Sequence, residues 1–253
     1  DTDTTQLGFY LQDEISTDKW DVILGVRYDH NKMDAKSDNF WLASDESGAN
    51  SDVLGEPHDF EDGHVAPSIK AIYKVNPNTN IYGKYDRGFR APSWDEFNSS
   101  RIGIFPVEFH PIFGFPTNYS GYATIGNPDL KAETSDNIEI GVKRNTKYSN
   151  FTLAAFFNSY NDFLEKSASD GTVDITTPAG VRTVRRLRTK NVDDASIWGV
   201  ELTSAYNFNK KDTGFTIGNS ISYQEGNNDT EDEPLHTIQP FTFINVINYT
   251  FPN

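Results

Sequence analysis

Five histidines are the residues best suited to metal or cofactor chemistry in this sequence of 253 residues. The chain has no cysteine, which excludes disulfides, cysteine-ligated zinc, iron–sulfur clusters and cysteine nucleophiles, so any metal needs imidazole or carboxylate ligands. His110 stands among Phe105, Phe109, Phe113, Phe115 and Tyr119. Its imidazole could bind a metal while the rings cover a flat ligand. An ordinary loop histidine whose aromatic neighbours pack the loop is the alternative.

The other candidate groups favour plain surface chemistry. The remaining histidines fall in or beside segments predicted as long loops, and they are His30, His58, His64 and His236. Acidic clusters at 45–46, 59–62 and 229–233 could hold calcium, but none has the spacing of an EF-hand, so solvated loops are predicted. The sequence has neither a Gly-x-Ser-x-Gly elbow nor a His-Glu-x-x-His motif. We therefore predict that the chain is not an enzyme.

Composition predicts an all-β protein that does not bind nucleic acid. Acidic residues outnumber basic ones by 37 to 22, giving a formal charge of −15, and no basic run exceeds Arg185-Arg186. The chain is 13% aromatic, with 18 glycines and one methionine, and it is rich in residues that suit strands and turns. It contains no apolar run of about 18 residues, so no transmembrane helix is predicted.

Strict alternation of apolar and polar residues predicts about nine strands. In one example, Trp20, Val22, Leu24 and Val26 share a face that Asp21 does not. The alternating runs are 6–12, 20–28, 68–74, 81–86, 137–143, 151–158, 198–206, 215–223 and, less cleanly, about 241–251.

The lengths of the connections favour a membrane barrel over a soluble sandwich. Short connections at 16–19, 76–80, 145–149 and 209–214 alternate with longer ones at 30–63, 92–131, 161–182 and 225–235. Short turns at one end and long loops at the other are typical of an outer-membrane up-and-down barrel. Aromatic residues near the predicted strand ends fit the two membrane interfaces, although a sandwich core would also use them. Because open strand edges are not tolerated in hydrocarbon, nine strands are predicted to be part of a larger barrel.

Several ordered motifs resemble the barrel of TonB-dependent outer-membrane receptors. They are YGKYDRGFRAPS (82–93), GNPDLKAET (126–134) and the strand NIEIGVK (137–143), and the resemblance covers nearly the whole chain. It implies that residues 1–253 form part of a 22-stranded transmembrane barrel in the bacterial outer membrane, whose plug domain and remaining strands lie outside this chain. Lipid and, through the plug, the TonB complex are the implied partners.

The same motifs resemble the haem and haemoglobin branch of that family. Phe89-Arg90-Ala91-Pro92 and Asn127-Pro128-Asp129-Leu130 are similar to the boxes that bracket an outer loop with a haem-ligating histidine, and His110 is the histidine between them. The segments SWDEF (93–97), GYATI (121–125) and IWGVE (197–201) add to the resemblance. It implies haem as transported ligand rather than resident cofactor. His110 would then ligate the haem iron, with Phe109 and Tyr119 beside it.

The box residues also have a structural interpretation, which we prefer. Pro92 would end strand pairing, and Arg90 would pair in the lumen with a carboxylate such as Asp86 or one from the plug. The segment 127–129 would be a turn that aims the next strand.

The sequence therefore predicts a receptor that binds haem, haemoglobin or another haem carrier at its outer loops and imports haem iron. Its lumen would be lined by polar groups including Arg27, Lys70, Lys84, Glu139 and Glu201. The alternatives are uptake of a ferric siderophore or another nutrient, and a non-transporting barrel that serves as an adhesin or outer-membrane enzyme.

Overall fold

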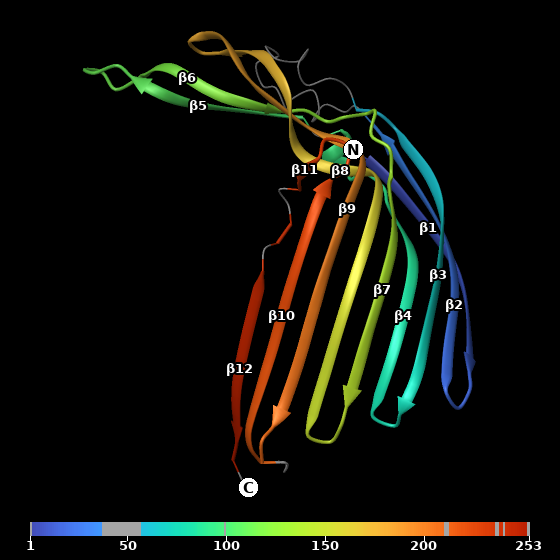
Figure 1. Cartoon of the computed structure of the whole chain (residues 1–253). Helices are drawn as coiled ribbons and strands as arrows, with labels where there is room; N and C mark the ends of the chain where they lie inside the picture. The colour runs from blue at the N-terminus through green and yellow to red at the C-terminus, as the bar shows by residue number, and fades with distance from the viewer. Residues whose placement is uncertain are drawn as a thin grey trace.

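The structure, a computed structural model, is almost entirely antiparallel β-sheet (Figure 1). It describes residues 2–36, 57–98, 100–209, 213–235, 238–239 and 241–251, with the side chain of residue 193 left out. Each of the nine predicted strand segments lies on a strand of one continuous wall. In order across the sheet these strands are β1 (Thr2–Ser16), β2 (Trp20–Ala35), β3 (Phe60–Asn76), β4 (Thr79–Arg90), β7 (Glu133–Asn145), β8 (Ser149–Thr177), β9 (Gly180–Asn207), β10 (Gly214–Asn228) and β12 (Thr242–Thr250).

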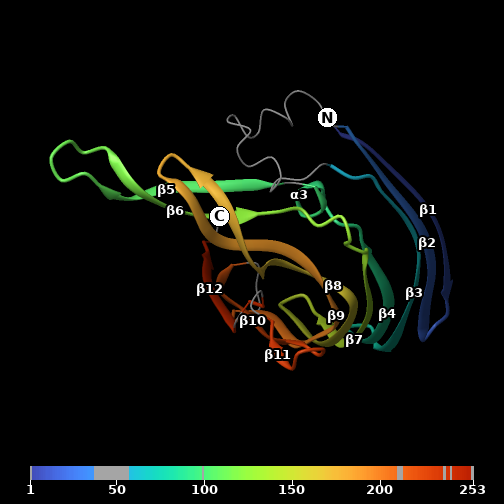
Figure 2. The same ribbon diagram turned by 90° about the horizontal axis from the view of Figure 1, so that it is seen from above.

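The wall is an open arc when seen from above (Figure 2). Tight turns join β1 to β2, β3 to β4 and β7 to β8 at one end, which is the lower end in Figure 1. The longer connections gather at the other end, called the rim below. The described part of the chain therefore has the predicted architecture of a partial up-and-down barrel whose sheet does not close on itself.

Strand register separates two chemically different faces. On the apolar face Tyr85 lies opposite Ile138, Ile138 opposite Phe157, and Phe157 opposite Trp198, so one row crosses four strands. Ile138, Phe157 and Trp198 remain exposed, as do most large side chains of this face. An apolar surface of this extent is unfavourable in water and suits hydrocarbon. We assign it as the lipid-facing outer side.

The opposite face carries charged and polar side chains that pair with each other. Lys84 Nζ lies 2.6 Å from Asp86 Oδ1, and Lys74 Nζ lies 2.6 Å from Asp21 Oδ1. The Tyr82 hydroxyl donates a hydrogen bond of 2.5 Å to Glu139 Oε1. The predicted lumen residues all lie on this face, and they are Arg27, Lys70, Lys84, Glu139 and Glu201.

Aromatic pairs mark both limits of the apolar band. Trp20 packs on Tyr73 with ring centroids 4.9 Å apart, and Phe215 packs on Tyr249 at 4.6 Å, both near the tight turns. Towards the rim Trp198 meets Tyr223 edge to face at 5.8 Å. Rings at two levels match the girdles that sit at membrane–water interfaces.

The last strand, β12, alternates imperfectly because it places an apolar residue on the polar face and a polar residue on the outer face. Ile244 of β12 lies opposite Ser220 on the polar face, so apolar residues occur there on both sides of the strand. On the outer face the amide of Asn245 donates a 2.6 Å hydrogen bond to Asn219 Oδ1, so these two amides satisfy one another instead of facing lipid unpaired.

Two long hairpins rise from the rim where the sequence predicts loops, and this prediction was wrong. The first consists of β5 (Arg101–Phe109) and β6 (Pro116–Thr124) and follows the single turn of helix α3 (Trp94–Phe97). The second is the extension of β8 and β9, which reaches a two-residue turn closed by Gly180 at φ +100°. The hairpins pass over the concave side of the arc and project beyond it (Figures 1 and 2). A short parallel pairing of β6 with β9 at 122–124 and 185–187 joins them.

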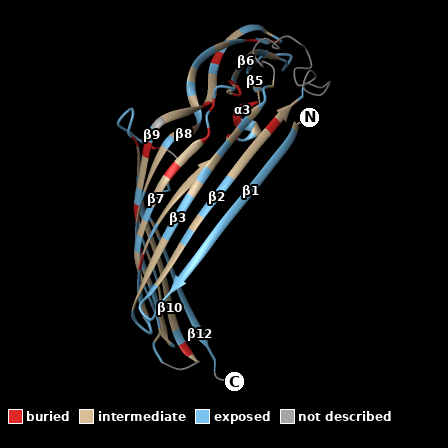
Figure 3. Ribbon diagram, turned by 90° about the vertical axis from the view of Figure 1, so that its right-hand side faces the viewer, coloured by how far each residue is buried: buried red, intermediate tan, exposed pale blue. Residues whose placement is uncertain are grey.

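Buried residues concentrate at the rim, as Figure 3 shows. One cluster contains Met33, Phe97, Leu130 and Leu164, and a second, formed by residues of both hairpins, contains Ala123, Ile125, Ile175 and Val184. The short strand β11 (Glu233–Pro234) completes the rim beside β10. No helix in the described ranges is long and apolar enough to cross a membrane.

The two faces give a test within one strand. Leu202 lies midway between Trp198 and Tyr206 on the outer face of β9, whereas Thr203 points to the lumen. We expect Leu202→Arg to destabilise the complete barrel by about 2–4 kcal/mol in urea unfolding from lipid vesicles, and Thr203→Arg to cost less than about 1 kcal/mol. Equal losses would contradict the assignment of the faces.

Candidate functional site

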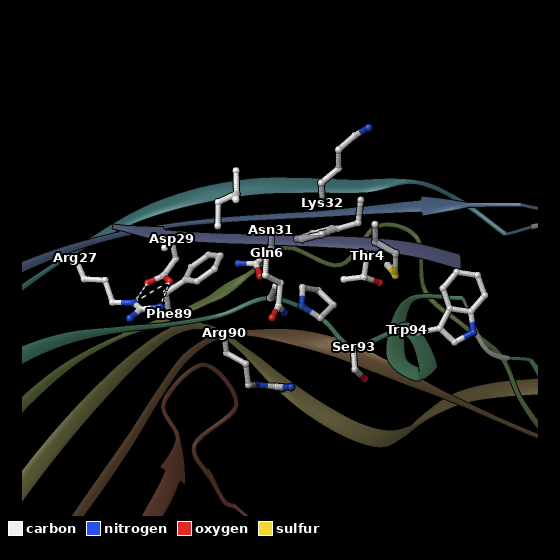
Figure 4. Close-up of a pocket in the computed structure, with 16 residues that line it drawn as sticks. Thr4, Gln6, Arg27, Asp29, Asn31, Lys32, Phe89, Arg90, Ser93 and Trp94 are labelled. Carbon is white, nitrogen blue, oxygen red and sulfur yellow. Dashed lines mark hydrogen bonds and ion pairs between the residues drawn. The ribbon is translucent and has the colours of Figure 1, made fainter. Parts of the chain in front are cut away.

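The first box, Phe89-Arg90-Ala91-Pro92, lies at the end of β4 and places two of its side chains on opposite sides of the chain. Phe89 and Arg90 point in opposite directions in Figure 4. Arg90 Nη1 lies 3.1 Å and 3.0 Å from the two Glu96 oxygens, and its Nε lies 3.6 Å from Glu133 Oε2. Arg90 therefore pairs with carboxylates as predicted, but they are Glu96 and Glu133 instead of the suggested Asp86, which pairs with Lys84. Arg90 thus ties the end of β4 to α3 and to the start of β7.

Glu96 is the centre of these contacts, which are called the anchor below, and its side chain is only 4% exposed. Its Oε2 accepts a 2.8 Å hydrogen bond from the Ser93 backbone, and its Oε1 lies 3.2 Å from Lys166 Nζ of β8. Burial acts to raise the pKa of Glu96, but the Ser93 amide, Arg90 and Lys166 outweigh it and hold the pKa below its ordinary value. The carboxylate is therefore ionised at neutral pH and joins α3, β4 and β8.

The second box packs against the same helix. The backbone nitrogen of Asn127 donates to the Glu96 carbonyl at 3.1 Å, and the side-chain Nδ2 of Asn127 donates to the Thr189 carbonyl of β9 at 2.9 Å. Asn127 Oδ1 accepts from the Asp129 backbone at 3.2 Å, which makes the local turn that the sequence predicts. Pro128 continues this turn, and Leu130 is buried in the first rim cluster. The two boxes, 35 residues apart in sequence, meet at one point of the rim.

A pocket of about 830 Å³ opens on the inner side of the rim (Figure 4). Phe89, Ala91, Pro92 and Trp94 line one side, and polar groups of β1 and β2 including Gln6, Arg27, Asp29 and Asn31 line the other. Arg27 and Asp29 pair with each other at 2.6 Å. The mixture of rings and convergent polar groups is typical of a ligand-binding recess.

His110 lies at the tip of the β5–β6 hairpin and organises its turn. Its Nδ1 accepts from the backbone nitrogens of Ile112 and Phe113, both at 3.3 Å. Its ring stacks on Phe115 with centroids 4.9 Å apart and meets Phe113 in a tilted contact at 5.0 Å, and because the two phenylalanine rings are themselves 6.3 Å apart the three rings form a triangular cluster. With Nδ1 as acceptor, a neutral imidazole carries its proton on Nε2, so iron binding through Nε2 requires the two contacts to Nδ1 to be released.

The other predicted neighbours of His110 do not contact its ring. Phe109 is exposed at the end of β5, and Tyr119 is half-buried on β6 opposite Pro106. The tip is instead an apolar surface: Ile112 is 80% and Phe113 is 73% exposed. Exposed aromatic and aliphatic groups of this size are typical of a contact surface for a partner.

The remaining histidines have separate surroundings. His30 Nε2 lies 3.6 Å from Glu61 Oε1, and His58 is held through its backbone by Asn98. His64 stacks on Phe89 at 5.2 Å, and its Nε2 is buried without a hydrogen-bond partner among the described residues. His236 and the acidic pair 45–46 lie outside the described residues. Within the ranges that the structure covers, no group of three or more histidine and acidic side chains could hold a metal ion.

Comparison with known proteins decides the family. The whole chain, residues 1–253, matches the family described as TonB dependent receptor-like, beta-barrel. The chain belongs to the TonB-dependent receptors. This receptor is accordingly a protein of the bacterial outer membrane, and the apolar face of its wall meets lipid.

Curated relatives of the receptor include proteins named for haemoglobin and a protein named for a siderophore. Hemoglobin-haptoglobin utilization protein B of Neisseria meningitidis serogroup A / serotype 4A is 26% identical over 93% of this chain and 28% of that protein. The probable TonB-dependent siderophore receptor PirA of Acinetobacter baumannii is 26% identical over 95% of this chain and 28% of that protein. The chain therefore spans less than a third of the length of either relative.

The fold of the receptor is shared with solved structures of low sequence identity. The copper transporter OprC superposes with a TM-score of 0.67 at 17% identity, covering 99% of this chain and 33% of that structure. This likeness supports the barrel architecture and carries no information on cargo.

Sequence reasoning missed the central residue of the receptor's anchor. Glu96 lies three residues after Ser93, the spacing of a capping box, and this signal was available in the sequence. Lys166 carries no comparable signal, because its approach to Glu96 depends on the path of β8 through two bulges.

The anchor predicts a dependence on pH. Because the pKa of Glu96 is lower in the folded than in the unfolded chain, its stabilisation is complete above about pH 4.3 and is lost as the pH falls through the folded value. We expect the hydrogen-exchange protection of the Ser93 amide in the complete receptor to fall about tenfold between pH 6 and pH 3, as for loss of one charge-assisted hydrogen bond of about 1.5 kcal/mol.

Two variants separate this effect from general acid damage. Glu96→Gln should have weak Ser93 protection at both pH values, whereas Asp95→Asn, at an exposed position of the same helix, should behave like the parent. A parent protein whose Ser93 protection does not change with pH would contradict the role of Glu96.

Proposed function

We propose that the complete receptor binds haemoglobin or another haem-carrying protein at its outer hairpins and imports haem iron. A plug domain outside this chain would couple the barrel to the TonB complex. The polar lumen would then carry the released haem inward after the plug rearranges.

The β5–β6 hairpin is the observation that carries this proposal. It presents exposed Ile112 and Phe113 at its tip, beyond the rim, where a large carrier protein can reach them. Its base is fixed by both boxes through Glu96 and Asn127, so the tip is held on an anchored arm. Apolar groups on an anchored support lose less conformational entropy on binding than groups on a free loop.

His110 is the proposed axial ligand of the haem iron. It lies beside two aromatic rings that could cover a porphyrin, and its two contacts through Nδ1 are long at 3.3 Å. Breaking such weak contacts costs less free energy than the formation of an iron–imidazole bond releases. Phe109 and Tyr119 are proposed as secondary contacts on the same hairpin.

The relatives support haem as cargo and keep one rival open. Relatives from Neisseria and Haemophilus, 26% and 24% identical, are named for haemoglobin and haemoglobin–haptoglobin, whereas PirA, 26% identical, is named as a siderophore receptor. A ferric siderophore is therefore the second candidate cargo.

Haemin titration of the complete receptor tests the proposal. We expect a shifted Soret band with the parent protein and with His58→Ala, the same change at an exposed histidine of the rim. His110→Ala should lose the shift and bind haemin at least about tenfold more weakly, a change of about 1.4 kcal/mol. Growth on haemoglobin as iron source should fall with it.

The contrary outcomes are distinct. A receptor that gives no Soret shift and does not bind haemoglobin, but takes up a ferric siderophore, refutes the haem cargo. A normal shift and normal growth with His110→Ala refute only its role as ligand.

A further inference from the structure

The end of the β8–β9 hairpin concentrates positive charge in an otherwise acidic chain. Between Gly180 and Val192 the sequence has five basic residues and no acidic one, although acidic residues prevail by 37 to 22 overall. Four of the five alternate along one side of β9, and they are Arg182, Arg186, Arg188 and Lys190.

Three of these cations converge on a single carboxylate. Asp170 Oδ2 lies 2.8 Å from Arg186 Nε and 3.7 Å from Arg188 Nε, and Asp170 Oδ1 lies 3.0 Å from Lys190 Nζ. Asp170 stands in the second bulge of β8, which turns its side chain towards β9. Burial opposes ionisation, but the three cations outweigh it and hold the pKa of Asp170 below its ordinary value. One negative charge therefore faces three positive charges.

The contacts leave hydrogen-bonding capacity unused. Arg188 Nε is buried and makes no hydrogen bond among the described residues, and neither does Asp170 Oδ2. The Arg186 Nε donates instead to the Asp170 backbone carbonyl at 2.9 Å. Buried charged donors without acceptors are uncommon and call for a partner. The side chains of Arg186 and Lys190 are 35% and 41% exposed, so a ligand can reach them from solvent.

Other acidic groups nearby do not neutralise the cluster. Glu165 is the cross-strand neighbour of Lys190, but no ion pair joins their described side chains. Asp174 accepts a hydrogen bond from Thr183 further along the hairpin. With Asp170 these two give three carboxylates against the five basic residues between Gly180 and Val192, so the end of the hairpin keeps a net positive charge.

We propose that Arg186, Arg188 and Lys190 form an anion-binding subsite for a ligand with two neighbouring anionic groups. This inference deepens the proposed function and rests on it for the ligand, because haem carries two propionate carboxylates. Guanidinium groups bind carboxylates through paired donors, and the surplus of cations over Asp170 matches a dianion. A phosphate group offers the same chemistry, so the experiment must separate the two sources.

Metal-free protoporphyrin IX tests the subsite without iron ligation. It is titrated by fluorescence against the complete receptor in nanodiscs of zwitterionic lipid, beside its dimethyl ester, which lacks the two charges. We expect the diacid to bind about tenfold or more tightly than the ester. Arg186→Gln with Arg188→Gln should abolish that preference, whereas Arg182→Gln should keep it, because Arg182 contacts Asn118 and the Val181 carbonyl instead of Asp170.

Asp170→Asn distinguishes a ligand site from a purely structural ion cluster. Removing the internal carboxylate takes away the negative charge that all three cations share, so we expect the diacid to bind severalfold more tightly to this variant. A structural cluster would be weakened by the loss of Asp170, and binding would stay the same or fall. Weaker or unchanged binding to Asp170→Asn overturns the proposal.

Failure of the subsite and failure of the proposed function give different results. If haemin binds but the diacid and ester bind alike, the haem function stands and the subsite is refuted. If neither haemin nor porphyrin binds, pyrophosphate and nanodiscs with anionic lipid are the remaining probes. Binding of either that Arg186→Gln with Arg188→Gln abolishes keeps the subsite for phosphate, and absence of all binding refutes it.

Discussion

The lack of water in hydrocarbon is the constraint on which the rest of this structure depends. A backbone amide or carbonyl exposed to lipid without a partner costs several kcal/mol, so strands in a membrane must pair continuously with their neighbours. The wall meets this requirement with unbroken antiparallel ladders from β1 to β12. The same ladders fix which side chains face outward, because a shift of one residue would move every charge of a strand into lipid.

Release from that constraint at the rim allows the hairpins to form. Above the upper aromatic level water can satisfy the backbone, so β5–β6 and the ends of β8 and β9 leave the wall and include bulges. A short parallel pairing and a buried apolar cluster then hold the two hairpins together. Glu96 and Asn127 fix their bases to the wall, which makes the recognition surfaces an extension of the barrel instead of independent loops.

The wall could be predicted from sequence because lipid on one face and water on the other require apolar and polar residues to alternate along each strand. The run from Trp198 to Tyr206 shows this clearly, and its registers follow the pattern. The hairpins could not be predicted in the same way: the register of β5 with β6 shifts after Pro106, and two bulges change the phase of β8 between Glu165 and Thr172. Glu96 had a signal in Ser93, whereas the convergence of three cations on Asp170 depends on those bulges and has no local signal.

The accessibility of successive β9 positions to a lipid-soluble and to a water-soluble collision reagent tests the two-faced wall most directly. The chain itself has no cysteine. Once any cysteines outside this chain are replaced, a single spin-labelled cysteine can be placed at each position from 198 to 203 in the complete receptor in lipid vesicles. Labels at Trp198, Val200 and Leu202 should collide with dissolved oxygen, which concentrates in the bilayer, and labels at Gly199, Glu201 and Thr203 with a water-soluble nickel chelate. The absence of this alternation, or its reversal, would contradict the assignment of the apolar face to lipid.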